Sequence, residues 1–199
     1  MTIEPILVAG LKNLATEFHP HELAYLAATC KIEFPIRDKL AFYLHRELAP
    51  SGLIVAREWS HIDLAIVLST GQPAAFLEAK AMYTFDALKN PSHFTSATSA
   101  DEKKAKALAG PDTAVYSLLL ATHLDQPVLA PNLKVVKYSA GINRALQTHQ
   151  TGDKVRAKAI EAIGQELAHR HVVKTGEISG GTAFGIGVSV LYWLVRNDE

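Results

Sequence analysis

Two acidic residues lie inside apolar, strand-like stretches of this sequence, and their spacing restricts how the chain can fold. The segment HIDLAIVLSTGQPAAFLEAK contains Asp63, Glu78 and Lys80 in the pattern Asp-x14-Glu-x-Lys. Residues Ile62 to Ser69 alternate, which predicts a β-strand with Asp63 on the face opposite to Ile62. Charged side chains on strands this apolar need an ion-pair partner or a metal.

A hairpin is expected to bring the acids together. Residues 70–73 (TGQP) are predicted to form a four-residue loop, and residues 74–81 to return as the second strand. If Ser69 faces Ala74, Asp63 lies opposite Lys80, and Glu78 lies two residues along on the same face. A loop of odd length would turn one strand over. The pattern therefore predicts that two carboxylates and an ammonium converge on one patch of the sheet.

Such a patch has the groups that phosphodiester hydrolysis requires. Two neighbouring carboxylates repel each other, and a hard cation such as Mg²⁺ relieves that repulsion. The cation can deliver a water nucleophile and neutralise a phosphate oxygen. A lysine beside it can lower the pKa of the attacking water or stabilise developing charge. The simpler alternative is a surface salt bridge of Lys80 with Asp63 or Glu78 on an edge hairpin.

The chain resembles the PD-(D/E)xK nuclease superfamily, which has the restriction-endonuclease-like fold. The resemblance rests on Asp63, Glu78, Ala79 and Lys80, on their hairpin, and on the helix and strand expected before it, and it covers about residues 31 to 122. Asp63 follows an isoleucine here, and not the proline that names the motif.

The resemblance implies a fold, a reaction and a set of site residues. The fold would be α/β (α+β), with a central mixed β-sheet flanked by helices and an N-terminal helical segment. The activity would be that of a Mg²⁺-dependent endodeoxyribonuclease, in which Mn²⁺ substitutes for Mg²⁺. Asp63 and Glu78 would bind the metal, helped by the Ala79 carbonyl, and Lys80 would be catalytic. Glu33 would be the acid on the preceding helix that completes the site, with Glu47 as its rival.

A second class of function stays open, namely a catalytically silent nuclease-fold module that acts through protein or nucleic-acid contacts. Net charge is zero, with 20 basic and 20 acidic residues, which counts against nonspecific coating of nucleic acid. The apolar stretch Gly187 to Val195 is a strand that could pair with a partner chain. A homodimer is left open on the same ground.

DNA, the expected partner, needs a concentrated positive charge to bind to a neutral protein. Basic residues gather between Asn132 and Ala159, where Asp153 is the one acid, and again just after residue 102. His61 shares the face of Asp63 and either touches a phosphate or ends the strand. The candidate DNA-binding residues are His61, Lys103, Lys134, Lys137, Arg144, Lys154, Arg156 and Lys158.

Length and composition predict one cytoplasmic domain. The 199 residues are 48% apolar, and no apolar stretch is long enough to span a membrane. The lone Cys30 excludes an internal disulfide and fits a reducing cytosol. We divide the single domain into an N-terminal helical extension (1–30), a catalytic core (31–140), and helices with a closing strand pair (141–199).

The remaining elements follow from hydrophobic periodicity and turn residues. We expect residues 83–98 to be irregular and a capping box at Ser99 and Glu102 to open the next helix. Strands are expected at Leu53 to Glu58, Val115 to Thr122, Leu133 to Tyr138, His171 to Ile178 and Phe184 to Val195. Helices are expected over KIEFPIRDKLAFYLHREL (31–48), with Pro35 in its first turn, and at residues 141–148 and 153–168, the last with Ile160 facing inward. The histidines lack the spacing of a zinc site.

Overall fold

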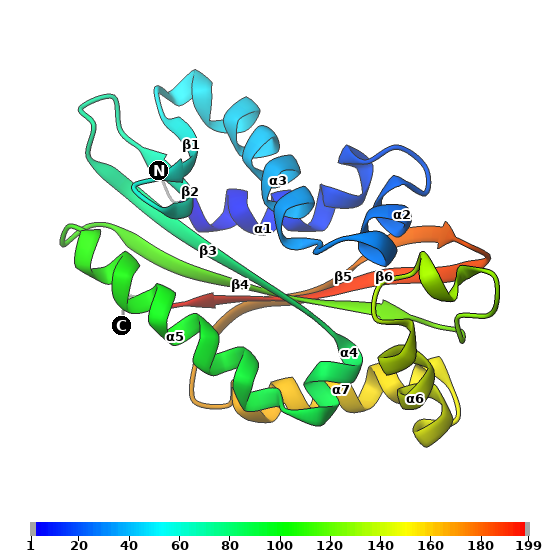
Figure 1. Ribbon diagram of the computed structural model, residues 1–199. Helices are drawn as coiled ribbons and strands as arrows, with labels where there is room; N and C mark the ends of the chain where they lie inside the picture. Colours follow the sequence, from blue (N-terminus) through cyan, green and yellow to red (C-terminus); the bar gives the residue numbers. More distant parts are fainter. Residues whose placement is uncertain (1–2, 198–199) are drawn as a thin grey trace.

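The computed structural model describes residues 3–197, with Phe94 described by its backbone alone, and contains one six-stranded mixed sheet (Figure 1). The strands lie in the order β1-β2-β3-β4-β6-β5. Their bounds are β1 Ile54–Trp59, β2 Ile62–Val67, β3 Pro73–Tyr83, β4 Ala114–Leu124, β5 His171–Ala183 and β6 Ile186–Arg196. Neighbouring strands are antiparallel except β3 and β4, which are parallel.

Helices cover both faces of the sheet (Figure 1). One layer contains α1 Ile3–Asn13, α2 Glu22–Thr29 and α3 Glu33–Leu48. The opposite layer contains α4 Thr84–Lys89, α5 Pro91–Leu108, α6 Ser139–His149 and α7 Gly152–Glu166. Short 3₁₀ turns are η1 Leu14–Glu17, η2 Ala49–Ser51 and η3 Asn132–Lys134. The expectation of a mixed α/β fold with a helical N-terminal segment is confirmed.

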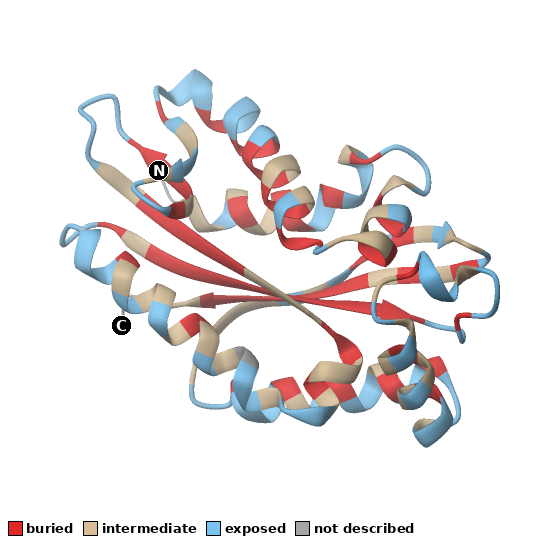
Figure 2. Cartoon of the chain, viewed as in Figure 1, coloured by how far each residue is buried: buried red, intermediate tan, exposed pale blue. Residues whose placement is uncertain are grey.

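The core lies between the sheet and its two helix layers (Figure 2). Strand β4 is buried along almost its whole length, which explains its largely apolar sequence. On α3, the residues expected to face inward at Ile36, Leu40, Leu44 and Leu48 are all buried. No helix within residues 3–197 is long and apolar enough to cross a membrane.

The β2–β3 hairpin forms, but with a different register from the expected one. Ile66 pairs with Ala75 and Val67 with Pro73, across an irregularity, so the expected pairing of Ser69 with Ala74 is wrong. Leu64 pairs with Leu77, and continuing this register places Asp63 across from Glu78 instead of Lys80. The shift is by two residues, which leaves every side chain on its face of the sheet.

Most of residues 83–98 is helical instead of irregular, with α4 over 84–89 and α5 from residue 91 onward. Asn90 ends α4 and caps α5, where its side chain accepts a hydrogen bond from the backbone N–H of His93. Pro91 occupies the first turn of α5, where a missing N–H costs nothing. The predicted helix start at Ser99 therefore lies inside α5. An Asn-Pro pair that looked like a loop centre is in fact a helix start.

Two further expectations are wrong. Residues 133–138 do not form a strand, because Val135 and Val136 donate their backbone N–H groups to the carbonyl of Asn132 and complete a local turn. Ile160 is exposed on α7 and does not face the core.

Strand β6, which was expected to be free to pair with a partner chain, is not free. It lies between β4 and β5, and both of its edges are hydrogen-bonded within the chain. Residues Gly187 to Val195 therefore cannot add a strand from a partner, and this ground for a homodimer is removed.

The cap of α5 can be tested by substitution. Replacing Asn90 with alanine removes the side-chain acceptor at the helix start and should lower the free energy of unfolding by about 1 kcal/mol. Asn90→Asp keeps an acceptor there and should retain most of the wild-type stability. Chemical denaturation measures both. Asn13 is the matched control, because it precedes η1 without a side-chain capping bond; Asn13→Ala should change stability by less than about 0.5 kcal/mol. Equal losses for the two alanine variants would contradict the cap.

Candidate functional site

Strand β3 extends past the beginning of β2 and leaves part of its edge without a strand partner. Three carboxylates accept hydrogen bonds from the backbone N–H groups on this edge. Asp63 Oδ2 lies 2.9 Å from the nitrogen of Ala79, Glu33 Oε2 lies 3.3 Å from that of Ala81, and Asp86 Oδ2 lies 3.3 Å from that of Tyr83. Alternate residues of a strand direct their N–H groups to the same side, so the backbone fixes the three acids in a row.

Asp63 and Glu78 form the central pair of the site. Glu78 is 4% exposed, and its pKa is raised to about 8 by burial, by the negative charge of Asp63 and by a hydrogen bond with Asp63. The buried Oε1 atom of Glu78 has no hydrogen-bond partner among the described residues. In the absence of a cation, Glu78 therefore keeps its proton to a higher pH than an exposed glutamate does.

Two cations lie beside this pair. A guanidinium nitrogen of Arg37, on α3, lies 3.7 Å from Asp63 Oδ1. The Lys104 ammonium, on α5, lies 3.5 Å from Glu78 Oε1 and also donates to the carbonyl of His61. Both helix layers thus supply counter-charges to the pair.

Lys80 is held by a residue that was not expected in the site. Its ammonium lies 2.7 Å from Asp101 Oδ2 on α5. Burial lowers the pKa of Lys80, but the hydrogen bond and the charge of Asp101 outweigh it and leave that pKa above its ordinary value. Lys80 is therefore a permanent cation at neutral pH, suited to stabilising negative charge and unsuited to acting as a base.

Of the two rival helix acids, Glu33 is the one that reaches the site. Glu33 is buried at the start of α3, and burial raises its pKa although Lys80 acts in the opposite direction. Glu47 lies in the last turn of α3, where its nearest ion-pair partner is Arg46 at 3.7 Å.

The remaining predicted DNA-binding residues do not make one continuous basic surface. Arg156 forms an ion pair with Glu177 of β5, Lys154 donates to Gln150, and Lys158 lies 3.3 Å from a ring nitrogen of His149. Lys137 lies over the ring of Tyr138. Lys103 on α5 is exposed, Lys134 lies in η3, and Arg144 lies on α6. His61 adopts a left-handed conformation in the turn between β1 and β2, and its carbonyl binds Lys104.

The Asp63–Glu78 pair could bind a metal through a few oxygen ligands, without a larger cluster of acidic side chains. Within residues 3–197 no group of three or more His, Cys, Asp or Glu side chains is arranged to hold one. Mg²⁺ needs less, because it is commonly bound by one or two carboxylates and keeps several waters. Three oxygen donors fit such an ion: Glu78 Oε1, which accepts no hydrogen bond within the described residues, the neighbouring Asp63, and the Ala79 carbonyl, which points to the same strand edge as its N–H.

Local sequence patterns could not have found several of the site residues. Asp101 and Lys104 come from α5, which packs on β3 although the sequence gives no register between a helix and a strand. Asp86 could have been found, since an acid three residues after Tyr83 at a helix start is a capping pattern.

Comparison with family models found no match for this chain, and the comparisons with curated proteins and with solved structures found none either.

The raised pKa of Glu78 predicts a pH-dependent stability. Glu78 binds its proton more tightly in the folded chain, with a pKa of about 8, than in the unfolded chain, with the ordinary value of 4.5. Between these values the folded state holds the additional proton, so the free energy of unfolding should fall as pH rises, by at most about 1.4 kcal/mol per pH unit. Thermal melts from pH 5 to pH 8 measure this.

Glu78→Gln should flatten that dependence and raise the melting temperature at pH 8. Glu161→Gln, which removes an exposed glutamate on α7, is the control and should keep the wild-type slope. A wild-type slope in Glu78→Gln would show that Glu78 does not carry the proton.

Proposed function

We propose that this protein is a metal-dependent nuclease that hydrolyses phosphodiester bonds in DNA, with a restriction-endonuclease-like fold. The observation that carries the proposal is the convergence of Asp63 and Glu78 on one strand face, with Lys80 two residues beyond. Order along the chain supports it: helix α3 and strand β1 precede the hairpin that bears the motif, as the resemblance to PD-(D/E)xK nucleases implies.

The acidic residues would have two roles: Asp63 and Glu78 would bind a metal, and Glu33 would accept a proton from the attacking water. Asp63, Glu78 and the Ala79 carbonyl would hold Mg²⁺, which when bound supplies a polarised water and a counter-charge for a phosphate oxygen. Glu78 would have to give up its proton to act as a ligand, because a carboxyl group binds a metal in its deprotonated form. Glu33, with its raised pKa, is placed to accept a proton from the attacking water.

Lys80 would stabilise negative charge on the phosphate and would not act as a general base. Its ammonium is fixed by Asp101 on the face that it shares with Glu78. Negative charge that develops on the phosphate in the transition state would be stabilised by a cation already in position. The contact with Asp101 orients this cation, so Asp101 is a positioning residue.

One observation favours a second candidate, the catalytically silent module. The Lys104 ammonium lies 3.5 Å from Glu78 Oε1, where it supplies the positive charge that a metal would otherwise provide. In a silent protein this contact would be permanent and would replace metal binding. In a nuclease, Lys104 would turn away when the metal enters, since its side chain is 40% exposed.

Cleavage assays with substituted proteins test the proposal. Asp63→Asn and Glu78→Gln should each reduce Mg²⁺-dependent cleavage of DNA by roughly 100-fold or more, because each removes a metal ligand. Lys80→Met should lower kcat with little change in KM. Glu33→Gln should lose activity, while Glu47→Gln on the same helix should keep it.

Absence of cleavage by the wild type would favour the silent module, above all if Lys104→Ala then gained metal binding. Full activity in the Asp63→Asn, Glu78→Gln double variant would contradict the site.

Metal binding should release a proton. At pH 7 Glu78 is protonated, so binding of Mg²⁺ should release about one proton per ion. Isothermal titrations in buffers with different ionisation enthalpies give this number. The Glu78→Gln protein should release none. Asp63→Asn should release less, because burial still raises the pKa of Glu78 but the negative charge of Asp63 no longer adds to it. Binding without proton release in the wild type would place the metal elsewhere.

A further inference from the structure

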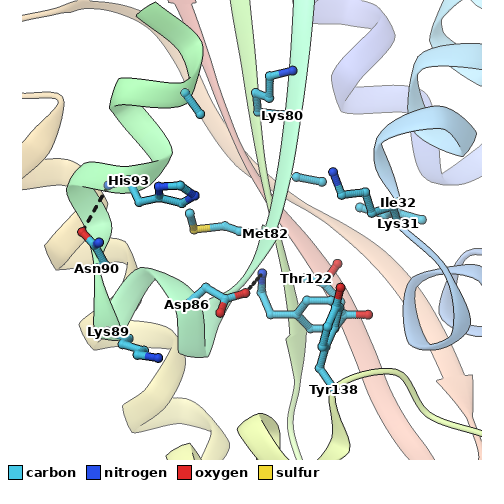
Figure 3. A pocket seen from close by; sticks show the side chains of 13 residues that line it. Lys31, Ile32, Lys80, Met82, Asp86, Lys89, Asn90, His93, Thr122 and Tyr138 are labelled. Atoms are coloured by element: carbon cyan, nitrogen blue, oxygen red, sulfur yellow. Dashed lines mark hydrogen bonds between the residues drawn. The ribbon is translucent and has the colours of Figure 1, made fainter.

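A cavity of about 550 Å³ opens at the free edge of β3, directly beside Lys80 (Figure 3). Its walls come from both helix layers, with Lys31 between α2 and α3 on one side and His93 of α5 on the other. Met82 of β3 and Thr122 of β4 also line it. Its volume is typical of pockets that enclose a small organic molecule.

The charges in this cavity favour an anionic ligand. Neither Lys31 nor Lys89 makes a salt bridge within residues 3–197; Lys31 acts on Glu33, and Lys89 on Asp86, at longer range. Asp86 is the acid of the cavity lining, and one of its oxygens is bound to the N–H of Tyr83. Two lysines without salt bridges, set on opposite walls, would bind phosphate groups.

Aromatic and apolar side chains line another part of the cavity. Tyr138 is 52% exposed, and its ring meets that of Tyr83 edge-on at 5.3 Å. A second ring, Phe85, supports Tyr138 at 6.4 Å. The partly exposed Tyr138 ring, which the Lys137 ammonium approaches to 5.3 Å from its centroid, is an aromatic surface on which a planar ring can stack.

We propose that this cavity binds one unstacked nucleotide of a DNA strand, next to the phosphodiester held at Asp63 and Glu78. The nucleobase would stack on Tyr138, and Lys31 and Lys89 would bind the flanking phosphates. A base reaches this half-open site only after leaving the helical stack, which costs least in a single-stranded or frayed segment. The inference rests on the proposed nuclease function for its substrate and names single-stranded DNA as the preferred form.

Binding measured without metal tests the cavity independently of cleavage. Fluorescence anisotropy of a labelled oligothymidylate and of a blunt hairpin duplex, both in EDTA, gives the two dissociation constants for each protein. The Lys31→Ala, Lys89→Ala double variant and Tyr138→Ala should each weaken binding of the oligothymidylate about tenfold. Both should leave binding of the duplex within about twofold, because the duplex keeps its bases stacked.

Two variants serve as controls. Tyr138→Phe retains the aromatic face and should bind as the wild type does, which separates stacking from a folding defect. Lys12→Ala removes an exposed lysine at the end of α1, outside the cavity lining, and should also bind normally. Thymidine 5′-monophosphate should compete with the oligothymidylate on the wild type and fail to do so on Tyr138→Ala.

The possible failures are distinguishable. Equal oligothymidylate binding by all variants, or tighter binding of the duplex, would overturn the cavity proposal even if the wild type cleaves DNA. Tighter binding of oligouridylate would overturn the assignment to DNA. Variant-sensitive binding without any cleavage would support the cavity and contradict the nuclease function.

Discussion

The pairing of β2 with β3 ends with Leu64 opposite Leu77, next to Asp63, and the positions of the candidate catalytic groups follow from that ending. Beyond this point the backbone of β3 still offers N–H groups, and unpaired donors on a partly buried edge are costly. The carboxylates of Asp63, Glu33 and Asp86 accept them. A structural need of the sheet thus places acids in a row at the site where chemistry is proposed.

This arrangement is energetically unfavourable because it buries the carboxyl group of Glu78 beside that of Asp63. Glu78 is buried next to Asp63 and keeps a proton that an exposed glutamate would lose at neutral pH. Arg37 and Lys104 reduce the repulsion without removing it, since Oε1 of Glu78 still has no hydrogen-bond partner in the described part of the chain. A carboxyl pKa raised in this way is typical of sites that bind a cation or perform acid–base chemistry.

The sequence predicted the hairpin and its shared face because a strand has a period of two. The register of the hairpin was wrong by two residues, and an even shift keeps Asp63, Glu78 and Lys80 on one face. Glu33 was predicted from the position of the helix acid in the family that the chain resembles, and the row of acids along β3 includes it and not Glu47.

What the sequence could not predict depends on contacts between distant elements. Asp101 and Lys104 reach the site because α5 packs across β3, and no local pattern gives the rotation of a helix over a sheet. Residues 133–138 have the alternation of a strand, but hydrogen bonds to the carbonyl of Asn132 close them into a turn. The apolar sequence of β6 was compatible with pairing to a partner chain, but β5 occupies that edge within the same chain.

The proposed chemistry depends on one divalent cation held between Asp63 and Glu78. Crystals of the wild type soaked in Mn²⁺ test it most directly, because the anomalous signal of manganese locates the ion without assumptions about the protein. The account predicts one peak within coordination distance of Asp63, Glu78 and the Ala79 carbonyl, with Lys104 displaced from Glu78. A map without a peak there, with Lys104 still beside Glu78 and the two acids still hydrogen-bonded, would contradict it.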